Sequence, residues 1–450
     1  MRIARIIFFI LLFLNTFCLF AQEVDSLKVA TPDLFLVQLD KESIIKIDTI
    51  IVVGNKLTDE KIILKELSFS VNDSINLSMI EYNELRVYDI GLFTQVKFFI
   101  FQDENERNTL QIHINERWYL FPYPIFGFKE RNWDNIFYGL GVAHINFLGL
   151  NQKIFASVVL GYDPSARLHY VNPNFIKKDY TIDAQVLYSK TKNKSYGERG
   201  IIDDFNENWY SARVLLGHRI DIYKHVRVNL GYKCLELSES VADRTISQNG
   251  KDEYFHMGVA GDINTTDLRE FPMQGEYIAL YLHKYGFGFS EIDFLQAGMD
   301  VRKYIPLANS HSLCFRVFTN ISIGSRIPYY SKFYFGYGER LRGSFKEIKE
   351  GENILGLFTE YRIILLGPKH LILEDMPMPQ LAVLRYGLAA SFFIDAGEVW
   401  DKKMFKWNKL DIGCGFGLNF LLPYSTVLRA EVGFNSSFKG KFIFDVGVSF

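Results

Sequence analysis

The sequence predicts a mainly β protein, in which a small α+β domain precedes a transmembrane antiparallel β-barrel. Aromatic residues, with 40 Phe and 25 Tyr, make up 16% of the 450 residues, and such residues favour strands. After about residue 118, many segments alternate apolar and polar side chains, as barrel strands do between lipid and a wet lumen. Beyond an N-terminal export signal, no segment is long and apolar enough to cross a bilayer as a helix.

The overall charge narrows the range of partners. The 50 basic and 52 acidic residues leave a formal net charge of -2, without the basic surplus that a nucleic-acid-binding protein carries. The hydrophobic share of 48% and the many aromatics argue against a disordered chain. We therefore expect a folded protein with no nucleic-acid partner.

The N-terminus has the layout of a secretory signal peptide. Arg2 and Arg5 precede an apolar run that ends at the small residue Ala21. The run is short for a membrane anchor, which needs about 20 apolar residues. We predict a signal peptide over residues 1–21, followed by a polar periplasmic lead over residues 22–44.

Residues 45–117 form the first compact unit, with the predicted order β-α-α-β-β. Its two helices are marked by apolar residues on one face and, at Ser78 and Glu81, by a capping-box spacing. The sequence does not decide whether the first strand or the strand at 96–101 is the exposed edge of the sheet. The predicted segments, in order, cover residues 45–53, 59–67, a helix beginning at 78, 96–101 and 110–114.

Residues 118–450 are predicted to form the barrel. The clearest alternation lies at the end of the chain, where Phe442, Phe444, Val446, Val448 and Phe450 share one face. With about 9–11 residues for each spanning strand, the segment accommodates roughly 14 to 18 strands. The alternative is a large soluble β-sandwich or propeller.

The junction between the two units contains two prolines. Pro122 and Pro124 lie just after the predicted start of the barrel. Since proline fixes its own backbone φ angle, we expect these residues to stiffen a connector.

Motifs in the first unit resemble those of a POTRA domain. They are IVVGN at residues 51–55, Thr58, GLF at residues 91–93, and Val96. POTRA domains are periplasmic and precede barrels of the BamA/TamA/Sam superfamily, also called bacterial surface antigens. The resemblance implies one POTRA-like domain followed by a barrel of about 16 strands.

Motifs in the barrel region resemble the same superfamily. GYGERLRGSF at residues 336–345 is similar to the Arg-Gly motif of a loop that folds back into the barrel, and SFFIDAGEVW at residues 391–400 is similar to a late strand with an inward Asp. A third set of residues is similar to the superfamily's Asp-rich strand and the short turn after it. These residues are Asp262, TTD at residues 265–267, Pro272 and Gly275. The aromatic terminal residue, Phe450, is typical of outer-membrane barrels.

The resemblance also implies a candidate site in the lumen. Its loop motif comprises Leu341, Arg342, Gly343 and Phe345. Arg342 is expected to reach acids on the barrel wall, with Asp395 as the first candidate and Glu360 as the second. A planar guanidinium can bond two carboxylates at once, which would fix the loop more firmly than a lysine could.

Enzyme chemistry finds no support in the motifs. The sequence has no G-x-S-x-G elbow, no HExxH and no P-loop. Once Cys18 is removed with the predicted signal peptide, Cys234, Cys314 and Cys414 remain. They are odd in number and far apart, so neither a disulfide framework nor a metal site is expected. The glycine-rich stretch 413–417 is predicted to be the small-residue face of a strand. We expect a protein that is not an enzyme and has no catalytic, metal or cofactor-binding residues.

The predicted function follows from the resemblance. It implies assembly or insertion of outer-membrane proteins, or polypeptide translocation, through a laterally gated barrel in the outer membrane of a Gram-negative bacterium. The partners would be the lipid bilayer, unfolded outer-membrane or secreted polypeptides, and, as a further candidate, accessory lipoproteins. The alternatives are a dedicated two-partner-type secretion pore and a lipid-transfer or structural surface antigen.

Overall fold

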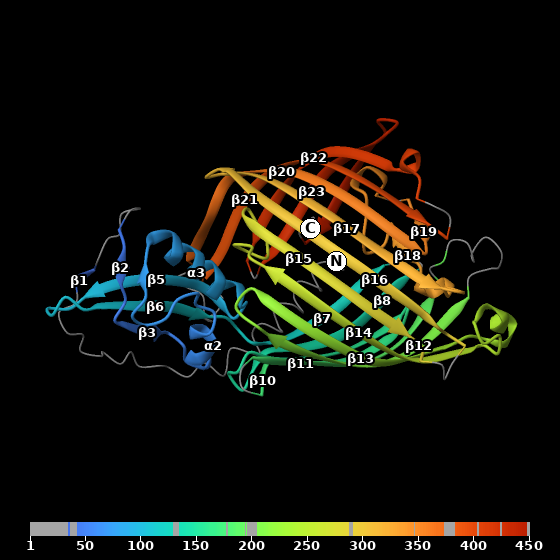
Figure 1. Ribbon diagram of the computed structural model, residues 1–450, viewed down its shortest axis with the longest axis horizontal. Coiled ribbons are helices and arrows are strands. Elements are labelled where there is room, and N and C mark those ends of the chain that lie inside the picture. The colour runs from blue at the N-terminus through green and yellow to red at the C-terminus, as the bar shows by residue number, and fades with distance from the viewer. Residues whose placement is uncertain are drawn as a thin grey trace, which may run out of the picture.

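The computed structural model consists of a small N-terminal domain attached to one end of a large curved sheet (Figure 1). The predicted signal peptide, most of the lead, Val448 and Phe450 lie outside the described residues. The described residues are 35–36, 43–128, 135–176, 179–193, 195, 205–287, 291–345, 347–372, 383–402, 405–423 and 425–447.

The N-terminal domain combines a four-stranded sheet with two helices. The strand order is β1-β5-β6-β3, in which β6 runs antiparallel to β5 and parallel to β3. The elements are β1 Phe35–Leu36, β2 Ile45–Lys46, β3 Thr49–Val53, α2 Glu60–Leu64, β4 Ser74–Ile75, α3 Leu77–Asp89, β5 Phe93–Gln102 and β6 Asn108–Glu116.

Two details of this domain differ from the predictions. The single strand expected at residues 45–53 is two strands, because Ile47 turns into the core and its backbone bonds to residues 72 and 73. The capping-box prediction at Ser78 was wrong, because the N-cap is Asn76, two residues earlier, and the helix begins at Leu77. Asn76 has the extended backbone of an N-cap, and its side chain accepts a hydrogen bond from Met79 N at 3.0 Å.

Both edges of the small sheet have backbone groups without a strand partner among the described residues. On one side β3 pairs only with β6, and on the other β1 pairs only with Phe101 and Gln102 of β5. On the β5 side Phe98 N donates to Glu84 Oε1 at 2.7 Å, so that edge is partly capped by a side chain, whereas both edges retain backbone groups without a strand partner in the part of the chain that the structure describes.

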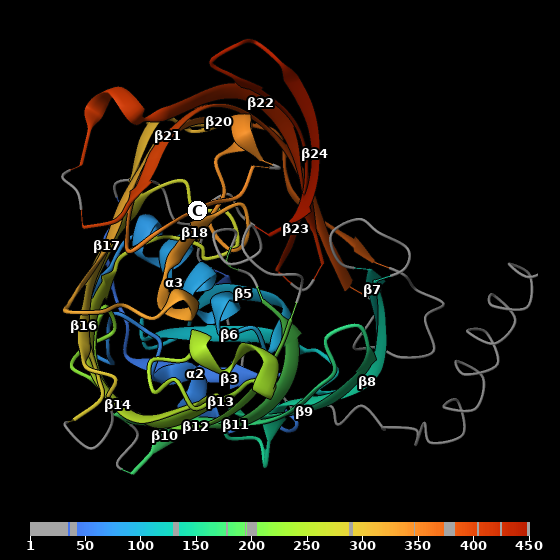
Figure 2. The same cartoon turned by 90° about the vertical axis from the view of Figure 1, so that its right-hand side faces the viewer.

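The large sheet contains 16 antiparallel strands that follow one another around a ring (Figure 2). Among them β20 and β21 are the longest, with 20 and 18 residues, and β24 is the shortest, with 7. The strands are β7 Leu120–Phe128, β8 Ile136–Phe147, β9 Gln152–Gly161, β10 Ser165–Phe175, β11 Tyr180–Lys192, β12 Asn206–Arg219, β13 Lys224–Glu236, β14 Lys251–Asn264, β15 Gly275–Tyr285, β16 Phe294–Ala308, β17 His311–Gly324, β20 Asn353–Ile372, β21 Val383–Trp400, β22 Asp411–Leu422, β23 Thr426–Asn435 and β24 Gly440–Val446.

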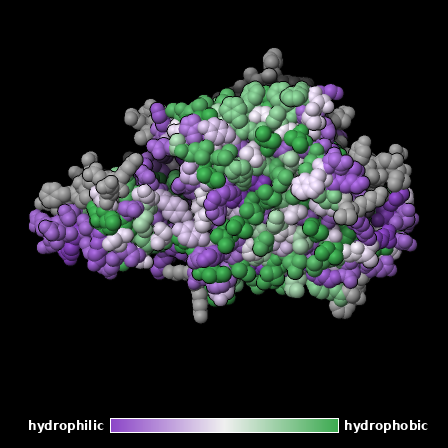
Figure 3. All heavy atoms as spheres, turned by 45° about the horizontal axis from the view of Figure 1, so that its top comes forward, coloured by the Kyte–Doolittle hydropathy of each residue, from purple (hydrophilic) through white to green (hydrophobic). Residues whose placement is uncertain are grey.

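The outer surface of the ring is apolar. On β24, for example, Phe442, Phe444 and Val446 are 66%, 62% and 64% exposed and point to the same outward face. Similar outward residues on the other strands form a hydrophobic region over the ring, while the N-terminal domain is mostly hydrophilic (Figure 3). Apolar side chains exposed over such a wide surface are suited to lipid. Within the described ranges, no helix combines the length and the apolar character needed to cross a bilayer.

The ring has a seam between its first and last strands. The strand order begins at β24 and ends at β7, and no ladder joins these two strands in the described part of the chain. Pro122 and Pro124 lie inside β7. The prediction that they stiffen a connector was therefore wrong. Because proline cannot donate a hydrogen bond to a ladder, both residues suit a strand at the edge of a sheet.

The turn between β14 and β15, residues 265–274, joins the N-terminal domain to the ring. Leu268 is buried in the hydrophobic core of the N-terminal domain. Arg269 Nε lies 3.2 Å from Asp89 Oδ2 of α3. At the other end of the turn, the carbonyl oxygen of Pro272 accepts a hydrogen bond from Arg362 of β20 at 2.8 Å.

A second contact between the two units centres on Glu66. Its carboxylate receives two bonds from Arg219 at the end of β12, at 2.6 and 2.9 Å, and one from Arg86 of α3 at 3.0 Å. Burial alone would raise the pKa of Glu66, but the hydrogen bond and charge of Arg219, together with Arg86, lower it below its ordinary value. The domain is therefore tied to the ring by a charged contact as well as by the apolar Leu268.

Candidate functional site: the lumen loop and the strands at the seam

The segment between β17 and β20 folds back into the ring (Figure 2). It contains the two-stranded sheet of β18 (Phe333–Phe335) and β19 (Lys349–Gly351), and between them the short helix η4 (Arg342–Ser344). η4 packs against β22, β23 and β24, the last three strands before the seam. We call residues 341–345 the loop tip.

Glycines allow the loop tip to lie directly on the strands. A Cβ atom added to Gly343 would come within 2.5 Å of Phe434 O and 2.6 Å of Gly413 Cα. One added to Gly433 would come within 2.4 Å of Arg342 O. These distances are too short for any side chain, so Gly343, Gly413 and Gly433 are all required for this close backbone contact. The predicted small-residue face at residues 413–417 therefore serves, at Gly413, to receive the loop.

Arg342 is fully enclosed and binds Asp395 of β21. Its Nε and Nη2 atoms donate to the two oxygens of Asp395 at 2.8 and 2.6 Å, and its backbone amide donates to Oδ2 at 3.0 Å. The Arg342 side chain is 4% exposed and that of Asp395 is 0% exposed. A guanidinium that binds both oxygens of a carboxylate fixes the orientation of the loop as well as its distance from the wall.

Two further acids complete the shell around Arg342. Nη1 of Arg342 bonds to Glu360 of β20 and lies 3.4 Å from Oε1 of Glu431 on β23. Both glutamates are almost completely buried. The loop is thus held by three neighbouring parts of the wall at once.

Two wall arginines balance these acids. Arg362 Nε donates to Glu360 Oε1 at 2.7 Å, and Arg429 Nη1 donates to Glu431 Oε2 at 3.2 Å. Each of the two carboxylate oxygens of Glu360 and of Glu431 therefore lies next to an arginine, and buried carboxylates need such a partner. The network extends toward the N-terminal domain at Arg362, which contacts Phe271 and Pro272 of the β14–β15 turn.

Aromatic rings support the loop motif from both sides. The guanidinium carbon of Arg342 lies 3.6 Å from the centre of the Phe393 ring, and that of Arg340 lies 4.5 Å from the centre of the Phe345 ring. The ring of Phe393 can pack against β22 because Gly415 has no side chain there. Phe345, which follows Ser344 in the loop motif, is 6% exposed.

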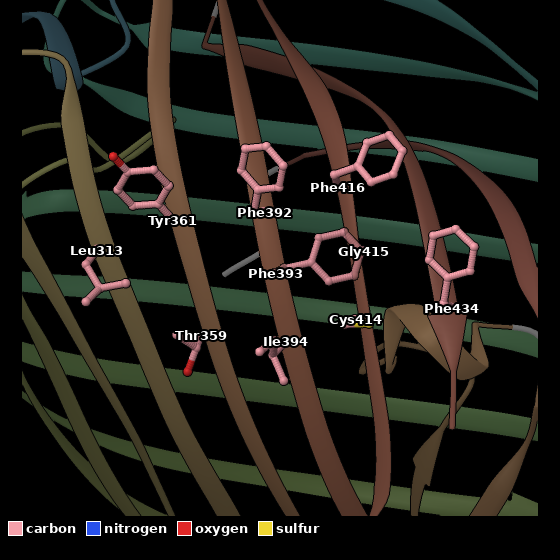
Figure 4. Close-up of a pocket in the computed structure, with 10 residues that line it drawn as sticks. All are labelled: Leu313, Thr359, Tyr361, Phe392, Phe393, Ile394, Cys414, Gly415, Phe416 and Phe434. Atoms are coloured by element: carbon pink, nitrogen blue, oxygen red, sulfur yellow. The ribbon is translucent and has the colours of Figure 1, made fainter. Parts of the chain in front are cut away.

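On the outer wall, the same strands form an apolar groove of about 420 Å³ (Figure 4). The groove exists because the small residues Cys414 and Gly415 lie among larger side chains. Its remaining lining residues are Leu313, Thr359, Tyr361, Phe392, Phe393, Ile394, Phe416 and Phe434. Phe393 thus contacts Arg342 on the lumen side and also lines the outer groove. Its ring therefore lies between Arg342 and the outer surface.

Comparison with known proteins identifies the family. Residues 146–450 match the Omp85 superfamily domain, and residues 45–117 match the POTRA family described as a surface antigen variable number repeat.

The chain belongs to the Omp85 superfamily.

Solved structures agree with this assignment at the level of the fold. BamA from Haemophilus ducreyi lacking POTRA domains 1–3 is 17% identical, with a TM-score of 0.53 over 93% of this chain and 89% of that one. CdiB from Escherichia coli is 10% identical, with a TM-score of 0.52 over 96% of this chain and 92% of that one. The fold is therefore a BamA-like outer-membrane β-barrel with one POTRA domain, as the sequence predicted.

Membership of the Omp85 superfamily sets the general activity. Its members are transport and assembly proteins that act on polypeptides at the outer membrane. Among the described residues, no group of three or more His, Cys, Asp or Glu residues is arranged to hold a metal ion.

The Omp85 barrel brings the predicted site residues together. Leu341, Arg342, Gly343 and Phe345 are all buried at the loop tip, and Arg342 contacts both Asp395 and Glu360. Phe442, Phe444 and Val446 lie on the outward face of β24.

Sequence reasoning missed three charged residues of the network and the ring beneath Arg342. The missed residues are Glu431, Arg429, Arg362 and Phe393. A signal was present for all four, because residues two positions apart on a strand share a face. Arg429 and Glu431 are two charged residues at that spacing in an otherwise apolar strand, and Arg362 lies two positions from Glu360. Phe393 lies two positions from Asp395, within the predicted late-strand motif.

Proposed function

We propose that the protein inserts or translocates polypeptides at the outer membrane of a Gram-negative bacterium, through the seam between β7 and β24. One observation carries this proposal. Among the described residues the 16-stranded sheet is not closed by a ladder between its end strands. Unpaired backbone groups are costly in lipid, so an incoming strand that pairs with them is stabilised there.

The composition of the seam strands supports the same function. Pro122 and Pro124 lack the backbone N–H group, so β7 has two fewer hydrogen-bond donors with which to pair with a neighbouring strand. β24 has 7 residues, whereas β20 and β21 have 20 and 18. Within the described residues, a short strand and a proline-containing strand can form fewer hydrogen bonds with each other than two long strands without proline.

The POTRA domain would receive the client first. Its sheet has two edges with unpaired backbone groups among the described residues, and an unfolded segment can add to either edge as a strand. The domain would lie in the periplasm, tied to the barrel by Leu268 and Glu66. No nucleotide is required, because the folding of the client releases free energy.

Site-specific crosslinking in cells tests the seam. A photoreactive amino acid at Phe126 of β7 or Phe444 of β24, which are 68% and 62% exposed, should capture client polypeptides. Leu280 of β15, 57% exposed on the opposite wall, is the matched control and should capture none. Equal capture at all three positions, or none at the seam, would contradict lateral insertion.

The identity of the captured clients separates the candidate activities. Capture of many barrel precursors, with a broad loss of outer-membrane proteins on depletion, supports assembly. Capture and loss of one secreted polypeptide supports a dedicated secretion pore. Absence of both outcomes favours lipid transfer or a structural role.

A further inference from the structure

The inner face of β24 carries three residues at alternating positions, and each is held in place. They are Lys441, Ile443 and Asp445. The outer face, by contrast, presents only apolar side chains to the membrane. In the described part of the chain β24 pairs with β23 alone, so the contacts of its inner face matter for its position at the seam.

The first contact joins β24 to the loop. Lys441 Nζ lies 3.2 Å from Glu347 Oε1. Glu347 is fixed to the loop tip, since its backbone amide donates to the carbonyl oxygen of Ser344 at 2.9 Å. Lys441 therefore binds the same loop segment that carries Arg342.

The second contact joins the other end of β24 to the Arg342 network. Arg429 Nη2 donates to Asp445 Oδ2 at 2.8 Å, and Arg429 Nε donates to the carbonyl oxygen of Gly447 at 2.8 Å. The same guanidinium bonds to Glu431, which in turn lies within reach of Arg342. Between the two ends Ile443 is fully buried, and η4 packs against the strand.

We propose that the pairs Lys441–Glu347 and Arg429–Asp445 form a latch that holds the terminal strand at the seam and links its release to the lumen loop. The proposal rests on the proposed function, in which β24 must leave its resting position to pair with a client strand. The Lys441–Glu347 pair must break when β24 moves away from the loop. The Arg429–Asp445 pair joins directly opposite residues of β23 and β24, so it must break when β24 shifts against β23.

The degree of burial indicates which contacts yield first. Glu347 and Asp445 have side chains that are 48% and 37% exposed, so water can hydrate both carboxylates when the pairs separate, while Arg429, which is 9% exposed, keeps its bond to Glu431. The pairs of Arg342 with Glu360 and Asp395 are at most 4% exposed, and separating them would leave buried charges unpaired. The latch pairs can therefore separate while Arg342 keeps its bonds to Glu360 and Asp395.

Distance measurements across the seam test the latch. The protein without its predicted signal peptide, and therefore without Cys18, would carry spin labels at Leu140 of β8 and Phe444 of β24 in lipid nanodiscs, with Cys234, Cys314 and Cys414 replaced by alanine. Lys441→Gln and Asp445→Asn should each increase the fraction of molecules with a wide seam by about two- to five-fold, the effect expected for partly exposed ion pairs. Lys439→Gln, which removes an exposed lysine from the adjacent turn, is the control and should change nothing.

A charge exchange provides the second arm. Lys441→Glu should widen the seam, and adding Glu347→Lys should restore the narrow distance, because the pair is rebuilt with reversed polarity. Distances that match the Lys439→Gln control in every single variant, or an exchange that fails to restore the narrow seam, would overturn the latch. A seam that widens without any change in client crosslinking would support the latch and refute the proposed function.

Discussion

Arg342 holds Asp395 by three hydrogen bonds, two from its guanidinium at 2.8 and 2.6 Å and one from its own backbone amide at 3.0 Å. The backbone bond means that the loop, and not merely a long side chain, is fixed against β21. Lysine at this position could supply one charged bond but not the paired geometry. The contact thus determines where the loop tip lies in the lumen.

Loss of this contact should lower the stability of the barrel. Arg342→Ala leaves Asp395 and Glu360 buried without their shared cation, so we expect a loss of about 3–5 kcal/mol in the free energy of unfolding. Asp395→Ala should have a similar effect, and the double variant should lose less than the sum because the two residues share one interaction. Denaturant titration of the detergent-solubilised barrel, followed by heat-modifiable gel migration, measures this. Arg326→Ala, an exposed arginine of the same loop region, is the control, and strictly additive losses would contradict the coupling.

The close approach of the loop to β22 and β23 gives a sharper test. Gly343→Ala places a methyl group against Phe434 O and Gly413 Cα, and the resulting overpacking should cost about 1–3 kcal/mol. Gly338→Ala, in the same loop, meets nothing within 4 Å and should be neutral. Accessibility of a cysteine introduced at Ser344 to a membrane-impermeant reagent would report whether the loop is displaced. Equal accessibility in both alanine variants would show that the loop does not need Gly343.

The β14–β15 turn should stabilise the position of the POTRA domain. Leu268→Ala removes a buried side chain from the core of that domain, with an expected cost of about 2–5 kcal/mol to its local stability. Leu148, in a neighbouring turn and 71% exposed, provides the matched control Leu148→Ala. Hydrogen exchange of the amides in α3 and β5 should rise in the first variant only. Unchanged exchange after Leu268→Ala would mean that the turn merely touches the domain.

The charged contact at Glu66 predicts a dependence on pH. The pKa of Glu66 is lowered in the folded protein, so the ionised carboxylate stabilises domain docking. This contribution is complete above the ordinary carboxyl pKa of 4.5 and is lost as the pH falls through the lower folded value. We expect limited proteolysis between the domain and the barrel to increase below about pH 4 in the native protein. Glu66→Gln should weaken docking at neutral pH and reduce the change in cleavage over that interval, and an unchanged pH profile would exclude Glu66 as its source.

Much of the architecture could be predicted from local patterns. Alternation along the final strand correctly placed Phe442, Phe444 and Val446 on the lipid side, because successive strand residues point to opposite faces. Helix and strand types in the N-terminal domain followed from periodicity, although Asn76 replaced Ser78 as a cap and the first strand broke at Ile47. The strand broke because the backbone of Ile47 bonds to residue 73, whereas the cap moved because the Asn76 side chain accepts the bond from Met79 N.

The site was only partly accessible from sequence. The resemblance pointed to Arg342, Asp395 and Glu360, but Glu431 lies 89 residues from Arg342 and enters its shell only because the ring curls β23 toward the loop. The prolines of β7 could not be assigned from sequence either, since proline is compatible both with a stiff connector and with a strand at the edge of a sheet. By itself the sequence determined which faces meet lipid and water, since that depends on neighbouring residues two positions apart. Only the tertiary structure decided which charges meet in the lumen and where the ring remains unjoined, because both depend on the path of the chain between residues that are far apart in sequence.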